Sequence, residues 1–331
     1  MSKIRKLCFF DKKEALEMIS FLNNSAGDNY INHIMFNPFL LLHYLLPLSY
    51  KFLPESYVYK DNGEIKGIIT AAPAGNLNKK FEIKKLFFEE NAIEPAAELV
   101  QYVVSKYKAM GTASFVVRVD DYLPELIRMF ISRCGFSQIS YEKLWRINHI
   151  EKKDYKFLGY RDFRNSDAVY VAALYNESLM PHFRPLLNKE SREYRDIPCR
   201  GLAYYSEYKY VIEDYKTRTI AAYISIKTSD NENYILDLVQ SSWANVDIDE
   251  VIAYVNYQIH KRKKRYNLFI TTKKYVQNGE QQEQDFMSHR YECVQNQVVL
   301  TNSSARIIKN PEHSGKFTVI NQVYSGLGVT N

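Results

Sequence analysis

The chain has 331 residues, of which 46% are hydrophobic and 25% are charged, and its formal net charge is +6. This composition indicates a globular protein rather than a disordered or membrane-embedded one, and the length favours two domains. The mild positive charge comes with no nucleic-acid-binding signature, so no DNA partner is expected. The four cysteines are far apart and form no Cys-x-x-Cys pair, which argues against a zinc site or a disulfide framework and favours a cytoplasmic location.

The first 50 residues contain two segments that bear on targeting. The start, "MSKIRKLCFF", lacks the sustained apolar core of a signal peptide. The most apolar run, residues 36–50, contains His43 and Pro47 and is too short to span a bilayer, so no membrane span is expected. The seven histidines are scattered without metal-ligand spacing, and no metal site is expected.

Periodicity in the first half predicts an alternation of strands and helices. The hairpin is the strongest local signal, because Asp61-Asn62-Gly63 stands between two apolar strands. In chain order the expected elements are a strand at 4–10, a helix at 11–24, an apolar helical region at 36–50, the hairpin at 56–75, a strand at 81–88, a helix at 93–111, a strand at 112–119, a helix at 122–136 and a strand at 137–147.

The second half repeats this order. Its expected elements are a segment at 155–163, a helix at 166–179, strands at 207–214, 219–229 and 233–239, a helix at 247–264, a strand at 267–274, a helix at 280–291 and paired strands at 293–301 and 304–309. The charged stretch 147–156 is the expected linker. The sequence therefore predicts an N-terminal domain at 1–150 and a C-terminal domain at 151–331, with a short tail from Pro311.

This element order, together with a helix that ends in Gly135-Phe136, resembles the GCN5-related N-acetyltransferase (GNAT) superfamily, here in tandem. The resemblance implies an α/β fold of two GNAT-like domains, each a mixed, mostly antiparallel sheet flanked by helices. It also implies a V-shaped gap between neighbouring central strands of each domain. A single continuous sheet would, on this expectation, argue against a duplicated scaffold.

The resemblance implies an acyl-CoA co-substrate, bound between the fourth and fifth strands with its pyrophosphate on an Arg/Gln-x-x-Gly-x-Gly/Ala loop. Glycine and free helix amides let a backbone approach an anion closely. In the first half the three motif positions fall on Asn91, Glu94 and Ala96, of which only Ala96 fits; in the second half they fall on Ala244, Asp247 and Asp249, and none fits. The first half is the expected donor site, with cofactor-binding residues Leu86, Phe87, Phe88, Asn91 and Ala96.

Acidic residues mark the start of the second-half helix, in "ANVDIDE". Such residues stabilise a helix start by roughly 0.3–1 kcal/mol. They also occupy the place of a phosphate, since two like charges ~4 Å apart repel by about 4 kcal/mol at an effective dielectric near 20. We therefore interpret this junction as an ordinary capped helix.

Three residues are candidates for acid–base chemistry. Asp237 is a candidate general base, because it stands among apolar strand residues where burial would raise its pKa. Glu82 is the matching candidate in the first half. Tyr275 could replace the tyrosine that the family often places four residues before the glycine, where this chain has Ile131 and Phe286. The alternatives are an exposed strand face for both carboxylates and simple packing for Tyr275.

Two runs remain open to more than one interpretation. The basic run 260–266 either complements a helix dipole or contacts a nucleotide 3′-phosphate or an acidic acceptor. The apolar run 36–50 either packs between domains or holds an acyl chain or apolar peptide.

The leading functional hypothesis is an acyl-CoA-dependent N-acyltransferase. Its partners would be acyl-CoA and an amine-bearing small molecule or peptide, for example an amino acid or peptide that receives a medium or long acyl chain. The alternatives are a non-catalytic GNAT-scaffold binding protein, favoured by the acidic helix starts, and an aminoacyl-tRNA-dependent transferase.

Overall fold

The computed structural model describes residues 3–22, 54–73, 80–89, 92–148, 156–196, 206–214, 216–241, 243–244, 246–303, 306–309 and 317–320. The apolar run 36–50 lies outside these residues, and so does most of the expected linker. The domain boundary predicted near residue 150 falls in the same undescribed stretch, residues 149–155.

The described elements follow the predicted order. The helices are η1 (Phe9–Asp11), α1 (Lys12–Leu22), α4 (Ile93–Ala109), α5 (Pro124–Ser132), η2 (Asn165–Asp167), α6 (Ala168–Ser178), η3 (Pro181–Phe183), α7 (Arg184–Leu187), η4 (Ser191–Glu193), α8 (Ile248–His260) and α9 (Gly279–Ser288). The strands are β1 (Ile4–Lys6), β2 (Glu55–Asp61), β3 (Glu64–Pro73), β4 (Lys80–Phe88), β5 (Ser114–Asp120), β6 (Ser137–Arg146), β7 (Tyr160–Asp162), β8 (Ser206–Glu213), β9 (Ile220–Thr228), β10 (Asn233–Gln240), β11 (Asn267–Lys273), β12 (Glu292–Ser303), β13 (Arg306–Lys309) and β14 (Phe317–Ile320).

The predicted hairpin is confirmed. Strands β2 and β3 pair antiparallel around Asn62 and Gly63, whose positive φ angles of 50° and 90° suit the tight turn that Asn-Gly favours. One strand pairing is wrong: residues 306–309 pair with β14 in a separate two-stranded sheet, not with the strand before them.

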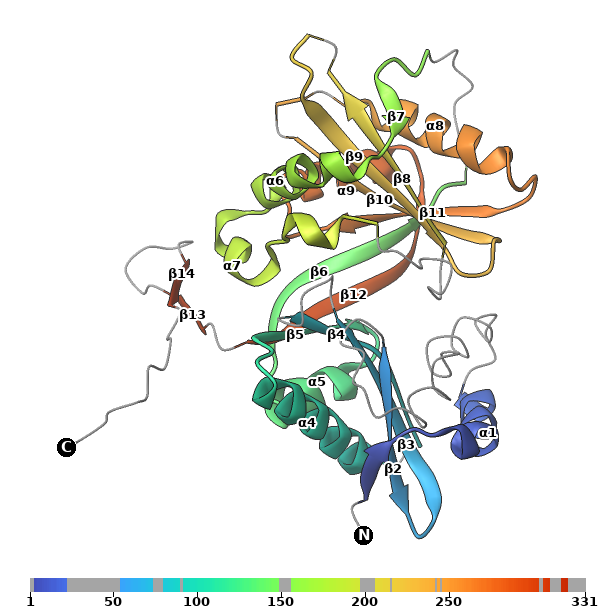
Figure 1. Ribbon diagram of the computed structural model, residues 1–331, viewed down its shortest axis with the longest axis vertical. Coiled ribbons are helices and arrows are strands. Elements are labelled where there is room, and N and C mark those ends of the chain that lie inside the picture. Colours follow the sequence, from blue (N-terminus) through green and yellow to red (C-terminus); the bar gives the residue numbers. More distant parts are fainter. Residues whose placement is uncertain are drawn as a thin grey trace, which may run out of the picture.

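Twelve strands form one sheet in the order β1-β2-β3-β4-β5-β12-β6-β11-β10-β9-β8-β7. Figure 1 shows this sheet running through both halves of the molecule. Only two neighbouring pairs are parallel, β4 with β5 and β10 with β11, and every other pair is antiparallel. The predicted mixed, mostly antiparallel sheet is confirmed.

The two halves exchange their last strands at the centre of the sheet. Strand β12 of the second half pairs with β5 of the first, and β6 of the first half pairs with β11 of the second. Strands β6 and β12 also pair with each other, and this contact makes the sheet continuous (Figure 1). The expectation of separate sheets was wrong, because sequence order does not reveal which half a terminal strand completes.

Helices cover both faces of the sheet. Successive side chains along a strand point to opposite faces, and apolar side chains lie on both. On one face of the first half, α4 and α5 pack on Phe115, Val117 and Leu300 in an apolar core. Their neighbours Val116 and Val299 point to the opposite face, where they join the core of α6. Helix α8 covers the second half through Val251 and Ile252, which pack with strand residues such as Ile224 and Leu236. None of the helices in the described ranges is long and apolar enough to cross a membrane.

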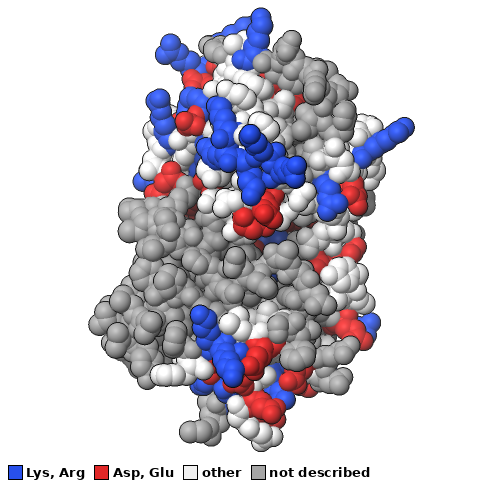
Figure 2. Space-filling model, turned by 90° about the vertical axis from the view of Figure 1, so that its right-hand side faces the viewer, with Lys and Arg blue, Asp and Glu red and all other residues white. Residues whose placement is uncertain are grey.

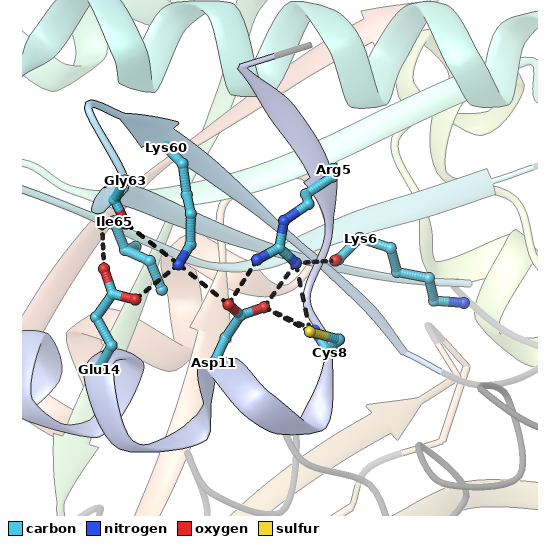
Figure 3. Close-up of polar contacts among 8 residues, drawn as sticks. All are labelled: Arg5, Lys6, Cys8, Asp11, Glu14, Lys60, Gly63 and Ile65. Atoms are coloured by element: carbon cyan, nitrogen blue, oxygen red, sulfur yellow. Dashed lines mark hydrogen bonds and ion pairs between the residues drawn. The ribbon is translucent and has the colours of Figure 1, made fainter. Parts of the chain in front are cut away.

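Asp11 fastens helix α1 to the edge of the sheet (Figure 3). Its carboxylate accepts hydrogen bonds from both terminal nitrogens of Arg5, at 2.6 and 2.7 Å, and from the backbone N–H and the thiol of Cys8. The Nζ atom of Lys60 on β2 lies 3.2 Å from the same carboxylate and 2.7 Å from Glu14 of α1. One buried side chain therefore holds β1, α1 and the hairpin together.

Replacing Asp11 by asparagine should lower the free energy of unfolding by about 2 kcal/mol, because it removes charge-assisted hydrogen bonds from a buried position. Urea titration followed by circular dichroism measures the change. The control is Glu17→Gln, which breaks an exposed pair with Lys13 at 3.9 Å and should change stability by less than about 0.5 kcal/mol. Equal effects of both variants would contradict the anchoring role of Asp11.

Candidate functional site

Each half contains a parallel strand pair that separates partway along. Strands β4 and β5 pair from Lys80 and Ser114 only as far as Ile83 and Val117, although both strands continue beyond. Strands β10 and β11 pair only as far as Leu236 and Ile270. Beyond these points the facing strand edges carry backbone groups without a strand partner, and such groups can bind a ligand. The V-shaped gaps predicted for both halves are thus present.

The gap of the second half contains a pocket. Its lining residues include Tyr175 and Ser178 of α6, Gln240 of β10, Lys273 of β11, and Asn278 and Gln282 at the start of α9. It is narrow, with about 20 Å³ of space for water. Helix α9 approaches β11 so closely that a Cβ atom at Gly279 would lie 2.1 Å from the carbonyl oxygen of Lys273, so this position requires glycine.

Charged side chains gather beside this gap, on the sheet face that α6 covers. We call this group the central charge cluster. It comprises Glu82 and Lys84 of β4, Arg118 of β5, Glu142 of β6, Lys227 of β9, Asp237 of β10, Lys273 of β11, and Lys189, which follows α7. Both halves therefore contribute to one polar site.

Arg118 lies at the centre of the first-half part of the cluster. Its Nη1 atom donates to Glu82 at 2.7 Å, and its Nε atom donates to Glu142 at 2.7 Å. The hydroxyl of Tyr275, from the second half, donates to the other oxygen of Glu142 at 2.7 Å. Glu82 also accepts a hydrogen bond from Lys84. These contacts link the two halves through a chain of hydrogen bonds.

Asp237 and Lys273 form a pair in the second gap. The Nζ atom of Lys273 donates to Asp237 at 2.5 Å, and Lys273 lines the pocket. Asp237 is the first β10 residue beyond the paired segment, so it stands where β10 and β11 begin to separate. The structure thus brings all three predicted catalytic residues, Asp237, Tyr275 and Glu82, to the same sheet face.

The electrostatic surroundings differ from the expectation for a buried base. Burial alone would raise the pKa of Asp237, but Lys273, Lys189 and Lys227 outweigh burial and hold this pKa below its ordinary value. Burial also opposes ionisation of Glu82, yet Lys84 and Arg118 lower its pKa to about 2. The prediction that burial would raise the pKa of Asp237 was wrong, because the sequence does not show these cations.

The side chain of Tyr275 is buried, and both its ring and its hydroxyl make contacts within the fold. Burial, then the charge of Glu142, raises its pKa well above the ordinary value. Its ring packs near Phe183, and its hydroxyl already donates to Glu142. Tyr275 therefore orients Glu142 in this arrangement.

The starts of α8 and α4 differ, because a side chain caps the free amides of α8 and none caps those of α4. At α8, the carboxylate of Asp247 accepts hydrogen bonds from the backbone of Asp249 at 2.9 Å and Glu250 at 3.5 Å. The prediction of an ordinary capped helix is confirmed. At α4, the N–H of Ala96 donates to Ala92 within the helix at 3.1 Å, and its side chain is buried in the core.

The other predicted coenzyme residues lie beyond the paired part of β4. Leu86 and Phe88 pack against the core under α4, and Phe87 packs on the opposite face. Asn91 lies outside the described residues. The side chains of these three β4 residues are occupied by packing, so only their backbone is left to contact a ligand.

The two halves repeat one further detail after their fifth strands. Gly135 and Arg290 both have positive φ, at 68° and 56°, and the next residue of each donates a backbone hydrogen bond to the preceding helix, Phe136 to Phe130 and Tyr291 to Phe286. This local similarity supports the internal repeat that the sequence showed only as element order.

The basic run lies away from the gap. Lys261 to Arg265 follow the C-terminal end of α8, whereas the N-terminal end of this 13-residue helix follows β10 at the gap. At about 1.5 Å per residue, the two ends are roughly 20 Å apart. Figure 2 shows Lys and Arg side chains gathered on the second half, at the top of the molecule. The basic run therefore lies at the far end of α8 from the second gap.

Sequence reasoning missed Arg118, Glu142, Lys189 and Lys273. A signal existed for Arg118, because it is the only charged residue in the apolar stretch "SFVVRV". The described residues contain no group of three or more His, Cys, Asp or Glu side chains that could hold a metal ion.

No protein-family model matches the sequence, and no curated protein matches it. Solved structures are similar. A tandem GNAT protein from the clavulanic acid biosynthesis pathway, solved without AcCoA, is 10% identical, covers 92% of this chain and 99% of its own, and has a TM-score of 0.59. A GCN5-related N-acetyltransferase from Sphaerobacter thermophilus is 8% identical over 91% of this chain and 95% of its own, with a TM-score of 0.57.

A Drosophila protein is 11% identical, covers 91% of this chain and 98% of its own, and has a TM-score of 0.53. These similarities extend over both halves, so the continuous sheet does not argue against a duplicated scaffold, and that expectation was wrong. The chain therefore has a tandem GNAT fold.

Proposed function

We propose that the protein is an acyl-CoA-dependent N-acyltransferase that acts on an amine acceptor. The observation that carries this proposal is the second gap, where two parallel strands separate beside a pocket and an ionised Asp237–Lys273 pair. An acyl thioester in the gap would place its carbonyl next to groups that can hold and move protons, as amine acylation requires.

The residues of the second gap have distinct roles in this proposal. Asp237 attracts and orients the ammonium group of the acceptor, which loses one proton to solvent before the attack, and Asp237 receives the second proton as the C–N bond forms. Lys273, which lines the pocket, donates a proton toward the departing sulfur. Arg118 and Tyr275 fix Glu142 and so position the adjoining part of the cluster. Amino acids and peptides with medium or long acyl chains are the proposed products, and the compartment proposed is the cytoplasm.

The pyrophosphate of the donor does not fit the start of α8, because Asp247 already occupies the free amides there. We therefore place only the thioester end in the second gap. The first gap, with the backbone of Leu86 to Phe88, remains the second position proposed for the donor.

One observation favours a different function, a non-catalytic binding protein on a GNAT scaffold. The capped α8 start is unfavourable for coenzyme binding, and the lowered pKa values of Asp237 and Glu82 are unfavourable for base catalysis. The two functions differ in a measurable way, because only the acyltransferase binds acyl-CoA.

Thermal unfolding with acetyl-, octanoyl- and palmitoyl-CoA tests the proposal. A donor at one hundred times its dissociation constant should add about 2.7 kcal/mol of stability. Gln240→Trp should abolish this shift by filling the second gap, whereas Gln281→Trp, on the exposed side of α9, should preserve it. No shift with any chain length would contradict the acyltransferase and favour the binding protein. An unchanged thermal shift in Gln240→Trp would indicate that the donor binds in the first gap.

A further inference from the structure

The central charge cluster contains more cations than carboxylates. Its cations are Lys84, Arg118, Lys189, Lys227 and Lys273, and its carboxylates are Glu82, Glu142 and Asp237. Each carboxylate has a cation within hydrogen-bond distance. Lys227 is 3.8 Å from Glu207. Lys189 forms no ion pair within 4 Å with a carboxylate of the described residues, although Asp237 and Glu193 act on it from farther away.

Hydrogen bonds to helix α6 fix the backbone of Lys189. Its backbone N–H donates to the side-chain oxygen of Asn176 on α6, and the Asn176 amide donates to the carbonyl of Lys189, both at 2.8 Å. The Nζ atom lies 4.4 Å from the ring centre of Tyr175 and 5.4 Å from that of Tyr194. Two aromatic faces attract the cation but do not neutralise it.

A second polar group in the same place also lacks a partner. Tyr194 is buried, and its hydroxyl makes no hydrogen bond within the described part of the chain. The Tyr194 ring lies 6.4 Å from that of Tyr175, which lines the pocket of the second gap. Buried polar groups nearly always find partners, so the unsatisfied hydroxyl of Tyr194, beside the half-buried cation of Lys189, indicates a missing acceptor of hydrogen bonds.

The surroundings of Lys189 agree with a missing anion. Burial lowers its pKa, and Asp237 and Glu193 counteract burial only in part, since Lys227 and Arg118 also lower it. An anion at this position would balance the positive charge. A carboxylate matches the two available donors, one charged and one neutral.

We propose that the ligand of this site carries a carboxylate, which Lys189 and Tyr194 bind. This inference rests on the proposed function and specifies its acceptor. The carboxylate lies at Lys189 while the amine of the same molecule lies toward Asp237, which belongs to the same cluster. The acceptor is therefore an amino acid or a short peptide with a free carboxyl group.

The test compares the twenty amino acids with their α-amides, without acyl-CoA, by thermal shift and then by calorimetry on those that bind. At least one amino acid should bind, and its amide should bind at least tenfold more weakly. Binding of no amino acid, equal binding of acid and amide, or stronger binding of inorganic phosphate would each overturn the proposal.

Substitutions distinguish a ligand-binding role of Lys189 and Tyr194 from a purely structural one, because they compare ligand affinity with the melting temperature. Lys189→Met should weaken binding of the amino acid at least tenfold while leaving the melting temperature of the free protein unchanged or higher, because it removes a half-buried cation that forms no ion pair within the described residues. Tyr194→Phe should weaken binding about threefold or more. The control, Lys227→Met, removes a neighbouring cation that has its own partner and should change affinity less than twofold. Unchanged affinity in Lys189→Met, or a lowered melting temperature with unchanged affinity, overturns the proposal.

A thiol-release assay separates this inference from the function on which it rests. Acylation of amines and amides as fast as amino acids would overturn the carboxylate site and leave the acyltransferase intact. Binding of amino acids without thiol release from any acyl-CoA would overturn the acyltransferase and leave the carboxylate site as part of a binding protein.

Discussion

Replacing Arg118 by methionine should lower the free energy of unfolding by about 3 kcal/mol at neutral pH. The guanidinium stands between Glu82 and Glu142, and both carboxylates are largely buried. Removing one partner of a buried ion pair leaves the other charge uncompensated, which typically costs 3–5 kcal/mol. The lower end applies here because about 30% of the Arg118 side chain remains exposed. Urea unfolding followed by circular dichroism measures the loss.

The matched control is Arg133→Met, which breaks a surface pair with Glu94 whose side chains are 43% and 67% exposed. That change should cost less than about 1 kcal/mol. A loss of similar size in both variants would contradict the bridging role of Arg118.

Acidification should reduce the loss in free energy of unfolding that the Arg118→Met substitution causes. The folded-state pKa of Glu82, about 2, lies below its ordinary value of 4.5. A lowered folded pKa adds stability that is present above the ordinary pKa and is lost as the pH falls toward the folded one. The difference between wild type and Arg118→Met should therefore narrow between about pH 4.5 and pH 2. A constant difference across that window would assign the loss to packing instead of charge.

Replacing Leu300 by alanine should cost about 3 kcal/mol and destabilise the first half, although Leu300 comes from the second. The side chain is fully buried in the core under α4 and α5, and truncation of such a leucine costs 2–5 kcal/mol. Strand β12 also pairs with β5 over seven positions, so loosening β12 removes support from the first-half sheet.

Hydrogen exchange resolved along the chain measures where the Leu300 substitution acts. Exchange should accelerate in β5 and α4 as much as in β12 itself. The control is Leu158→Ala, a truncation of the same size at a side chain that is 62% exposed, and it should leave exchange unchanged. Faster exchange confined to α8 and α9 would contradict the strand exchange.

Much of the fold could be predicted because local signals were strong. Asp61-Asn62-Gly63 predicted the hairpin, and the apolar stripe of residues 93–111 predicted α4. The strand partners of β6 and β12 could not be predicted. Both strands contain apolar residues, and either could complete the sheet of its own half, so only the packed structure decides.

The site was predictable by position but not by chemistry. Asp237 and Glu82 were found because single acids stand out in apolar strands, and Tyr275 because it follows a strand end. Their partners Lys273 and Arg118 come from other strands, and these partners reverse the pKa shift expected from burial. Charge pairing between distant segments leaves no periodic trace in the sequence, which is why Lys189 was missed as well.

The exchanged strand has a consequence for synthesis of the protein in the cell. Strand β5 ends at Asp120, but its neighbour β12 ends at Ser303, roughly 180 residues later. At about 5–20 residues per second, the ribosome needs on the order of ten seconds or more to supply it. During that interval the nascent first half carries an uncovered strand edge, a site where aggregation begins. Chaperones that shield such edges should therefore matter more for this chain than for one whose halves close independently.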